Sequence, residues 1–586
     1  DILFNYKIKH MKKLLLALVI HCSVVNFSIA QDDMKSVWSI KLEHKAELNE
    51  FDEASGILVS SNEKEISIVD ATTGKVKWTK DFKTLCDGIM KKVDERIPMW
   101  EAKCIFLFDR KSGKDQMAVI DIETGQMLWS SNKYEGVTEA SIAYVPEVGM
   151  FAIANKKAFS MVKARTGEEV WETQGFKGTL AKYIYNASDN SIIALNYNPA
   201  AAGEGILGGM GKLFAGFGAF KSQLTKFSVK NGDILWQTDI KGAVEKEIAT
   251  RKILAKLKIV DNDKLMLIMQ GMQMFDLNNG SLLWGVTHSE EVLKESKRGI
   301  PSGYSGSKLV KSAVYGAVAD PLIDGNDVYL FDMQNKKNQY VSKYDLHTGK
   351  LIWKSKELKK LTIAPSLYKV GGKIIIQIGG WAQVQGIVEQ KSNYGGGFGG
   401  SGFSVSTYKR VKFYKEFSPY GVEALDATNG ELVWRSERFS KGVTNSFVHN
   451  GELVVASGKE LYNLNPDSGT EKYSESVKDD GIKETEQIFK VGDNVVVVCS
   501  KGMSNYVIAD GKKNWTVKTK KGDLSTVNNG MAFYITEKND FVVIDLTTGK
   551  YTTYDARKDS DSEIYEDGQY ILVFEKDKVT KLATKQ

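Results

Sequence analysis

One short phrase recurs along the chain, and it constrains the fold more than any other feature. It opens with Asp, carries Thr-Gly or Asn-Gly in the middle and closes with Trp, as in residues 70–78 (DATTGKVKW) and 426–434 (DATNGELVW). The closing aromatic residues are Trp78, Trp129, Trp171, Trp236, Trp284, Trp353, Trp434, Tyr473 and Trp515, and a tenth, decayed copy ends in Thr553. The last copies lie 38 to 42 residues apart, which is enough chain for four short strands.

Each copy is predicted to be a β-hairpin. Residues 56–61, 65–70 and 75–80 alternate apolar and polar side chains and are separated by turn residues, which indicates three strands. We expect the side chain of Asp70 to accept hydrogen bonds from the turn and Gly74 to adopt the positive φ that closes it. Trp78 would then be buried between neighbouring sheets.

Stacking such units in a ring buries both faces of every sheet, so the predicted fold is an all-β propeller of four-stranded antiparallel blades. Residues 36–42 resemble an outer strand without its blade, and residues 568–583 resemble inner strands without an outer one. Pairing these ends would close the ring and protect two sheet edges. This implies eight or more blades, up to eleven, in either one large ring or two rings.

The N-terminal residues have the pattern of an export signal. Residues 1–10 precede the first Met and are interpreted as upstream, non-native sequence. Residues 11–30 carry two lysines, an apolar run at 14–20 and small residues up to Ala30, which predicts a signal peptide and an exported, periplasmic or extracellular protein. A retained membrane anchor and a lipoprotein signal at Cys22 are weaker alternatives, and residues 31–586 are predicted to be the propeller.

Charge and cysteine content exclude two classes of protein. The chain has 79 Lys and Arg against 73 Asp and Glu; without residues 1–30 there are 75 and 72, a net charge of +3, which gives no overall signal for binding nucleic acid. Cys86, Cys104 and Cys499 remain, an odd number that is not a disulfide framework. Cys86 and Cys104 are either bridged or buried as small apolar residues.

The repeated phrase resembles the tryptophan-docking repeat of the PQQ-like propellers, over nearly all of residues 37–586. That family contains quinoprotein alcohol dehydrogenases and the non-catalytic propeller of the outer-membrane barrel assembly machinery, and the chain resembles the latter more. The dehydrogenases imply adjacent cysteines, a Trp beneath the quinone, calcium ligands and a catalytic Asp. This chain has no Cys-Cys pair and no calcium-loop motif, and Trp100 and Trp381 are only weak candidates for the quinone floor.

Other catalytic patterns are also missing from the sequence. His44, His288, His347 and His449 show no metal-type spacing, and there is no Gly-x-Ser-x-Gly elbow. We therefore predict no cofactor, no metal and no catalytic residues. A quinone-dependent dehydrogenase or another enzyme on a propeller frame is the alternative.

Three inserts interrupt the repeat at about 198–224, 289–316 and 383–421, and loops that break the rhythm of a rigid scaffold are frequent binding sites. The first is rich in apolar residues, with 213, 217 and 220 at helical spacing; it is either a docking element or a loop packed on its own ring. The third is predicted to be an extended hairpin with a Gly-rich tip. The candidate partner-binding residues are Leu213, Phe214, Phe217, Phe220, Tyr394 and Phe398.

The function expected from the sequence is that of an exported, non-catalytic scaffold that binds a protein or envelope component through these inserts. Nucleic acid is not expected as a partner. Peripheral contact with a membrane and the oligomeric state are left open.

Overall fold

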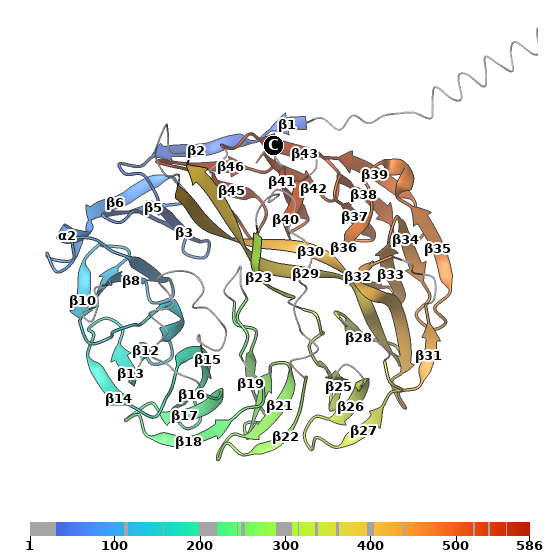
Figure 1. Cartoon of the computed structure of the whole chain (residues 1–586), viewed down its shortest axis with the longest axis horizontal. Helices are drawn as coiled ribbons and strands as arrows, with labels where there is room; N and C mark the ends of the chain where they lie inside the picture. Colours follow the sequence, from blue (N-terminus) through green and yellow to red (C-terminus); the bar gives the residue numbers. More distant parts are fainter. Residues whose placement is uncertain are drawn as a thin grey trace, which may run out of the picture.

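The computed structural model of the chain describes residues 31–110, 115–155, 158–198, 220–242, 244–247, 252–288, 308–314, 316–333, 338–358, 363–394, 403–436, 439, 441–519, 522–536, 540–557 and 560–585. Within these ranges the strands form eleven sheets. Figure 1 shows the sheets arranged around a single ring, which decides between one ring and two.

The first six blades follow the chain from the N-terminal side, each with four antiparallel strands. Blades 1 to 3 are β3 (Leu48–Asp52), β4 (Ile57–Ser61), β5 (Glu65–Asp70) and β6 (Lys75–Asp81); β7 (Glu95–Met99), β8 (Cys104–Asp109), β9 (Gln116–Asp121) and β10 (Met127–Ser131); and β11 (Ile142–Val145), β12 (Met150–Ala154), β13 (Phe159–Lys163) and β14 (Glu169–Thr173). Blades 4 to 6 are β15 (Thr179–Asn186), β16 (Ser191–Tyr197), β17 (Gln223–Ser228) and β18 (Ile234–Asp239); β19 (Lys256–Val260), β20 (Lys264–Ile268), β21 (Gly271–Asp276) and β22 (Leu282–Thr287); and β24 (Leu322–Asp324), β25 (Asp327–Met333), β26 (Gln339–Asp345) and β27 (Leu351–Lys354).

The remaining five blades complete the ring. Blades 7 to 9 are β28 (Leu367–Val370), β29 (Lys373–Tyr394), β30 (Phe403–Asp426) and β31 (Leu432–Arg435), with β23 (Lys308–Val314) added to β29; β32 (Val443–His449), β33 (Glu452–Ser457), β34 (Glu460–Leu464) and β35 (Glu471–Ser476); and β36 (Thr485–Val491), β37 (Asn494–Cys499), β38 (Gly502–Val507) and β39 (Lys513–Lys518). Blades 10 and 11 are β40 (Gly522–Asn528), β41 (Met531–Thr536), β42 (Phe541–Asp545) and β43 (Tyr551–Tyr554), with β1 (Gln31–Asp33); and β44 (Asp561–Ile564), β45 (Tyr570–Glu575), β46 (Lys578–Ala583) and β2 (Lys35–Lys41).

The predicted ring closure is confirmed. The N-terminal strand β2 is the outer strand of blade 11 and pairs antiparallel with the C-terminal β46, from Lys35 opposite Ala583 to Lys41 opposite Lys578. Just before it, β1 pairs in parallel with β43 of blade 10. The N-terminal segment therefore joins the last two blades.

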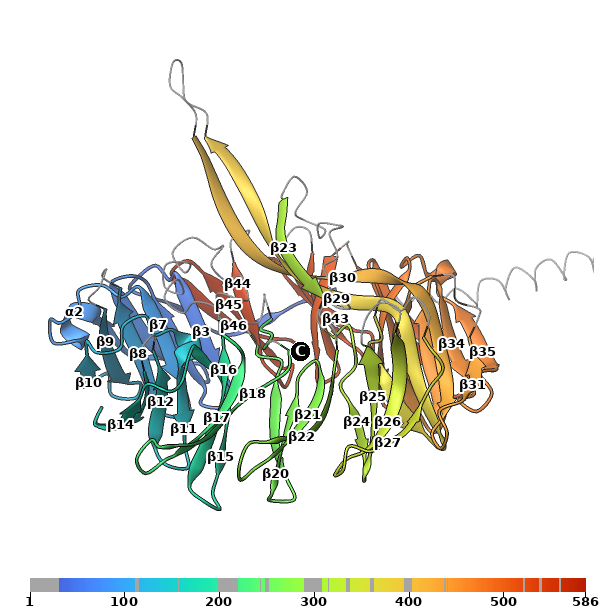
Figure 2. The same cartoon turned by 60° about the horizontal axis from the view of Figure 1, so that its bottom comes forward.

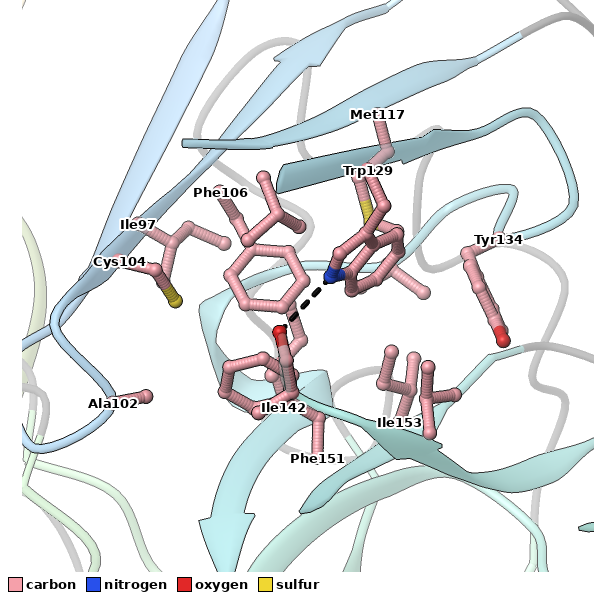
Figure 3. Close-up of a cluster of buried hydrophobic side chains, with 14 of the residues drawn as sticks. Ile97, Ala102, Cys104, Phe106, Met117, Trp129, Tyr134, Ile142, Phe151 and Ile153 are labelled. Carbon is pink, nitrogen blue, oxygen red and sulfur yellow. Dashed lines mark hydrogen bonds between the residues drawn. The ribbon is translucent and has the colours of Figure 1, made fainter. Parts of the chain in front are cut away.

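The repeated Trp fastens each blade to the next one. In the joint of Figure 3, Trp129 of blade 2 donates its indole N–H to the carbonyl of Ala164 in blade 3, at 3.0 Å. The same bond, at 2.7 to 3.2 Å, is made by nine tryptophans. Tyr473 replaces it with its hydroxyl, which donates to Ile508 O at 2.8 Å.

The Gly of each phrase receives the Trp of the preceding blade, or Tyr473 in the case of Gly511. A Cβ on Gly167 would lie 2.5 Å from Cδ2 of Trp129, and the φ of Gly167 is +69°. Both the close approach and the left-handed backbone therefore require glycine. The Gly and the Trp of one phrase therefore belong to two different joints. The Gly contacts the preceding blade, and the Trp contacts the next blade.

The Asp of the phrase has the predicted role. Asp70 Oδ1 accepts hydrogen bonds from the backbone N–H groups of Thr72 and Thr73, at 2.8 and 2.9 Å. These bonds hold the pKa of Asp70 below its usual value, and the bond from Thr73 has the largest effect. The Asp side chain thus fixes the turn on which the Trp of the neighbouring blade packs.

Two joints complete the ring in ways that the phrase did not reveal. Trp38 of β2, which lies outside the ten copies, packs on Gly74 and donates to Ala71 O, so blade 11 docks on blade 1. Between blades 10 and 11, where the copy is decayed, Thr552 Oγ1 donates to Thr584 O at 2.9 Å. Met34 is buried in the apolar cluster of the same joint.

The core is distributed around the ring as clusters between facing sheets, such as the one that joins Phe106 of blade 2 to Phe151 of blade 3 (Figure 3). The three cysteines of residues 31–586 are free and buried. The bridge between Cys86 and Cys104 is therefore not formed, and burial raises the pKa of both thiols to about 12. The interpretation as small apolar core residues holds.

Candidate interaction surface

The described ends of all three inserts lie on one face of the ring. In the first ten blades the docking turn, which is the turn of the repeated phrase, connects the third and fourth strands, so it lies on the face opposite the loop between the second and third strands. Residues 198–222 connect β16 to β17, residues 395–402 connect β29 to β30, and residues 288–321 connect β22 to β24. All three connections therefore emerge opposite the docking turns, on what we call the insert face.

A ribbon of three strands is the largest feature of this face. β29 and β30 pair continuously from Trp381 opposite Glu416 to Tyr394 opposite Phe403, which is the extended hairpin predicted from the sequence. β23 adds to β29 from Lys308 opposite Glu389 to Val314 opposite Val384. Figure 2 shows the ribbon rising well beyond the blades. The segment of β29 beyond Gly380 has 14 residues, roughly 45 Å of strand at about 3.3 Å per residue.

The ribbon bends away from its blade at two glycines. Gly379 and Gly380 have φ of +64° and +102°, and the pairing with β30 shifts register between Ile378 and Gly380. A Cβ on Gly380 would lie 2.1 Å from the carbonyl oxygen of Val443 in blade 8. The sequence therefore needs glycine here for a close backbone contact as well as for the bend.

The base of the ribbon is anchored to other blades. Gln385, which is fully buried, donates from Nε2 to Glu247 Oε2 at 2.9 Å, in the loop that precedes blade 5. Ala382 packs with Ala317 and Ile363 in a small apolar cluster. On the other side, the backbone N–H of Gly442 donates to Glu416 of β30. These contacts hold the base in a defined direction relative to the ring.

The candidate residues from the sequence are divided between the described and undescribed parts of the chain. Leu213, Phe214, Phe217 and Phe398 lie outside the described residues, as do residues 1–30 with the predicted signal. Tyr394 is the last residue of β29 and pairs with Phe403. Phe220 is half-buried, and its ring lies where a Cβ on Gly178 would be placed, at 2.3 Å from Cζ. At this end, the first insert packs on its own blade.

Sequence reasoning missed the third strand of the ribbon and its anchor. Residues 308–314 (KLVKSAV) alternate well enough to have indicated a strand, but nothing in them pointed to β29 as the partner. Gln385 was not singled out, because its pairing with Glu247 joins residues 138 positions apart.

The potential catalytic groups are dispersed around the ring. His44 lies near Ser67 of blade 1, the ring of His288 contacts Phe331 O, and His347 pairs with Asp261. Trp100 packs against the cluster between blades 1 and 2, whereas Trp381 lies at the base of the ribbon on blade 7. Among the described residues, no three His, Cys, Asp or Glu side chains are grouped as metal ligands.

Comparison with known proteins identifies the family. The family model described as "Outer membrane protein assembly factor BamB" matches residues 25–191, 220–380 and 420–583. The chain belongs to this family. The match omits residues 192–219 and 381–419, which are most of the first insert and the parts of β29 and β30 beyond the bend.

No curated protein sequence matches the chain. Among solved structures, BamB from Moraxella catarrhalis is 12% identical, over 69% of this chain and 92% of that one, with a TM-score of 0.27. The computationally designed Ika8 protein is 11% identical over 72% and 100%, with a TM-score of 0.31, and a europium-containing methanol dehydrogenase is 11% identical over 79% and 84%, with a TM-score of 0.28. At these scores the structural matches carry no argument about function.

Proposed function

We propose that this chain is an exported, non-catalytic scaffold whose insert face binds a protein of the cell envelope. The observation that carries the proposal is the anchored ribbon, which rises from a ring whose repeats are otherwise devoted to joining blades. The family description, an assembly factor for outer membrane proteins, supports an envelope partner and a role in assembly.

The chemistry of the ribbon supports binding to a protein. Its base is fixed by the contacts of Gln385 and Gly442. Binding of a partner would therefore cost little conformational entropy, because the ribbon is already ordered. Beyond the bend, β29 pairs with one edge of β30. The other edge of β30 pairs with a described strand only at Glu423–Leu425, on the blade side of the bend, where β31 lies. A strand edge of this kind is a frequent contact surface for extended segments of other proteins.

Site-specific photocrosslinking tests the proposal. A photoreactive residue at Lys308, an exposed position on β23, should capture an envelope protein, whereas the same residue at Lys75, in a docking turn on the opposite face, should not. The captured protein would be identified by mass spectrometry and purified.

Its affinity would then be measured for the intact chain and for a variant in which residues 390–407 are replaced by Asn-Gly. This variant ends the hairpin at the pair Glu389–Tyr408 and keeps all pairs of β23. The shortened ribbon should bind at least about tenfold more weakly, since few residues carry most of the energy of an interface. Equal affinity for both chains, or equal capture from Lys308 and Lys75, would refute the role of the ribbon.

A further inference from the structure

Six exposed lysines gather on the insert face of blades 8 and 9, where they form what we call the basic platform. They come from six different loop or strand-end positions: Lys441, Lys459, Lys478, Lys483, Lys501 and Lys518. Lys459 and Lys501 lie in the turns between the second and third strands, and the others lie on the connections between blades or at their ends. None of the six forms an ion pair or side-chain hydrogen bond with a described residue.

Hydrogen bonds to backbone carbonyl groups join these loops into one surface. Ser457 Oγ donates to Lys441 O at 2.8 Å, and the N–H of Val477 donates to Lys459 O at 2.8 Å. The N–H of Thr485 donates to Gly458 O at 2.7 Å. The lysines of blade 8 are therefore displayed from a fixed frame.

The same pattern continues into blade 9. The N–H of Lys501 donates to Ile482 O at 3.2 Å, and the N–H of Thr519 donates to Lys501 O at 3.0 Å. A Cβ on Gly481 would lie 3.4 Å from Lys518 Nζ, which brings this ammonium group beside the connection between the two blades. Two blades thus contribute to one continuous surface.

The buried acid next to the platform, Asp480, does not neutralise it. The buried carboxylate of Asp480 points inward, where it pairs with Lys513 and accepts hydrogen bonds from Ser504 and Tyr506 at 2.7 and 3.0 Å. These partners hold its pKa below the usual value, against the opposing effect of burial. Asp480 is therefore engaged within blade 9 and does not neutralise the lysines outside.

A cavity of about 420 Å³ opens within the platform. It is lined by Lys441, Lys459 and Lys478 together with Tyr462, two serines and the acids Glu460 and Glu484. The three ammonium groups can bind carboxylates, and the aromatic and hydroxyl side chains beside them can contact neutral residues. This combination suits an acidic polypeptide in which neutral residues separate the carboxylates.

We infer that the basic platform binds an acidic polypeptide segment of the partner. This inference rests on the proposed scaffold function and adds the chemistry of the partner. Two features favour a polypeptide over a membrane or nucleic acid. The platform lies at the foot of the ribbon, because Gly442, next to Lys441, is bonded to Glu416 of β30. A flat bilayer approaching this face would meet the projecting ribbon first (Figure 2), and screening limits the reach of the lysines to about 8 Å at physiological salt.

Nucleic acid is disfavoured by the acids in the cavity lining, Glu460 and Glu484, which would repel closely spaced phosphates. A polypeptide with spaced carboxylates can place its charges on the lysines and its neutral residues beside these acids.

The test uses the full mature chain and a fluorescent probe of twelve residues in which Glu alternates with Ser. The platform variant carries Lys459→Glu, Lys478→Glu and Lys501→Glu. Its matched control carries Lys75→Glu, Lys512→Glu and Lys550→Glu, three exposed lysines of docking turns on the opposite face. Both variants change the net charge equally, so they separate the platform from the charge of the whole molecule.

Fluorescence anisotropy at low salt should show at least about tenfold weaker binding of the probe to the platform variant and less than about twofold weaker binding to the control. Circular dichroism and the unfolding midpoint would confirm that both variants are folded. No binding to the wild-type chain, or an equal loss in both variants, would overturn the inference. So would tighter binding of a single-stranded oligonucleotide of equal charge or of vesicles containing phosphatidylglycerol.

The partner found by crosslinking at Lys308 distinguishes this inference from the proposed function. If that partner binds the platform variant as tightly as the wild type but needs the ribbon, the scaffold function stands and the acidic-segment inference fails. If the partner loses affinity for the platform variant and not for the control, both are supported.

Discussion

The two faces of the ring differ in how much freedom the fold leaves them. On the docking-turn face, most phrases supply an Asp that fixes the turn and a Trp that docks on the next blade, and the Gly of the phrase receives the aromatic ring of the preceding blade. On the insert face, the loops vary in length from a short turn at 458–459 to the ribbon of β29 and β30. The loops of the insert face can vary in length because they take no part in the joints between blades. We therefore expect binding sites on this face.

The largest effect is expected from removing a docking Trp. Trp129→Ala should lower the free energy of unfolding by about 3–5 kcal/mol, because the side chain is 8% exposed and a cavity would remain between blades 2 and 3. Urea unfolding followed by fluorescence and circular dichroism would measure it. Trp129→Tyr should cost less, since Tyr473 already serves one joint. A loss below about 1 kcal/mol for the Ala variant would show that the joints do not stabilise the ring.

Substituting the docking Gly should have the next largest effect. Gly167→Ala combines a left-handed φ with a clash against Trp129. The matched control is Gly149→Ala, which has a similar φ of +65° but nothing within 4 Å of the added Cβ. The control should lose about 1–2 kcal/mol from the backbone alone, and Gly167→Ala should lose clearly more.

The difference between these two variants isolates the contact with Trp129. In the background of Trp129→Ala, the difference should largely disappear, because the indole that causes the clash is gone. Equal losses for both variants in the wild-type background would contradict the role assigned to the docking Gly.

A smaller effect is expected when the turn Asp can no longer ionise. The backbone N–H of Thr428 and its neighbours lower the pKa of Asp426. A carboxylate with a lowered folded-state pKa contributes stability above its unfolded pKa, which is about 3.9, and loses it as the pH falls through the folded value. Asp426→Asn should fold, since Asn465 fills this role in blade 8, and its urea midpoint should fall less than that of the wild type between pH 5 and pH 3.

The smallest change in stability is expected on the insert face. Replacing residues 390–407 by Asn-Gly removes the outer ribbon but leaves every joint and the Gln385 anchor in place. The unfolding midpoint should stay within the equivalent of about 1 kcal/mol, although binding of the partner should become at least about tenfold weaker. A large loss would mean that the outer ribbon is part of the folding core.

The sequence predicted the ring because its signal is local and repeated. Each turn needs only the residues of one phrase, such as Asp70 and Gly74, so alternation and turn chemistry sufficed for the blades and for the closure at residues 36–42. The partner of each Trp was harder to predict, since Trp129 docks 35 residues further on. Trp38 was missed as a docking residue because its turn is split between the two ends of the chain.

The features of the insert face were predictable only in part. Alternation predicted the hairpin, but the bend at Gly380 depends on a carbonyl of blade 8, and the anchor at Gln385 depends on a loop far away in the sequence. The basic platform could not be predicted, because its lysines are spread over residues 441–518 and a near-neutral net charge conceals their grouping. Only the ring brings their loops together.

The pairing of β2 with β46 also has a consequence for the order of folding. The closing pair Lys35–Ala583 joins nearly the two ends of the described chain, so during synthesis β2, which emerges among the first strands, must wait for β46, the last one. Loop-closure entropy grows only slowly with length, by about 0.6 kcal/mol per doubling, and the intervening blades shorten the effective loop by docking in sequence. The N-terminal strand would then be held unpaired until ten blades are in place, a period in which its exposed edge needs protection from other chains.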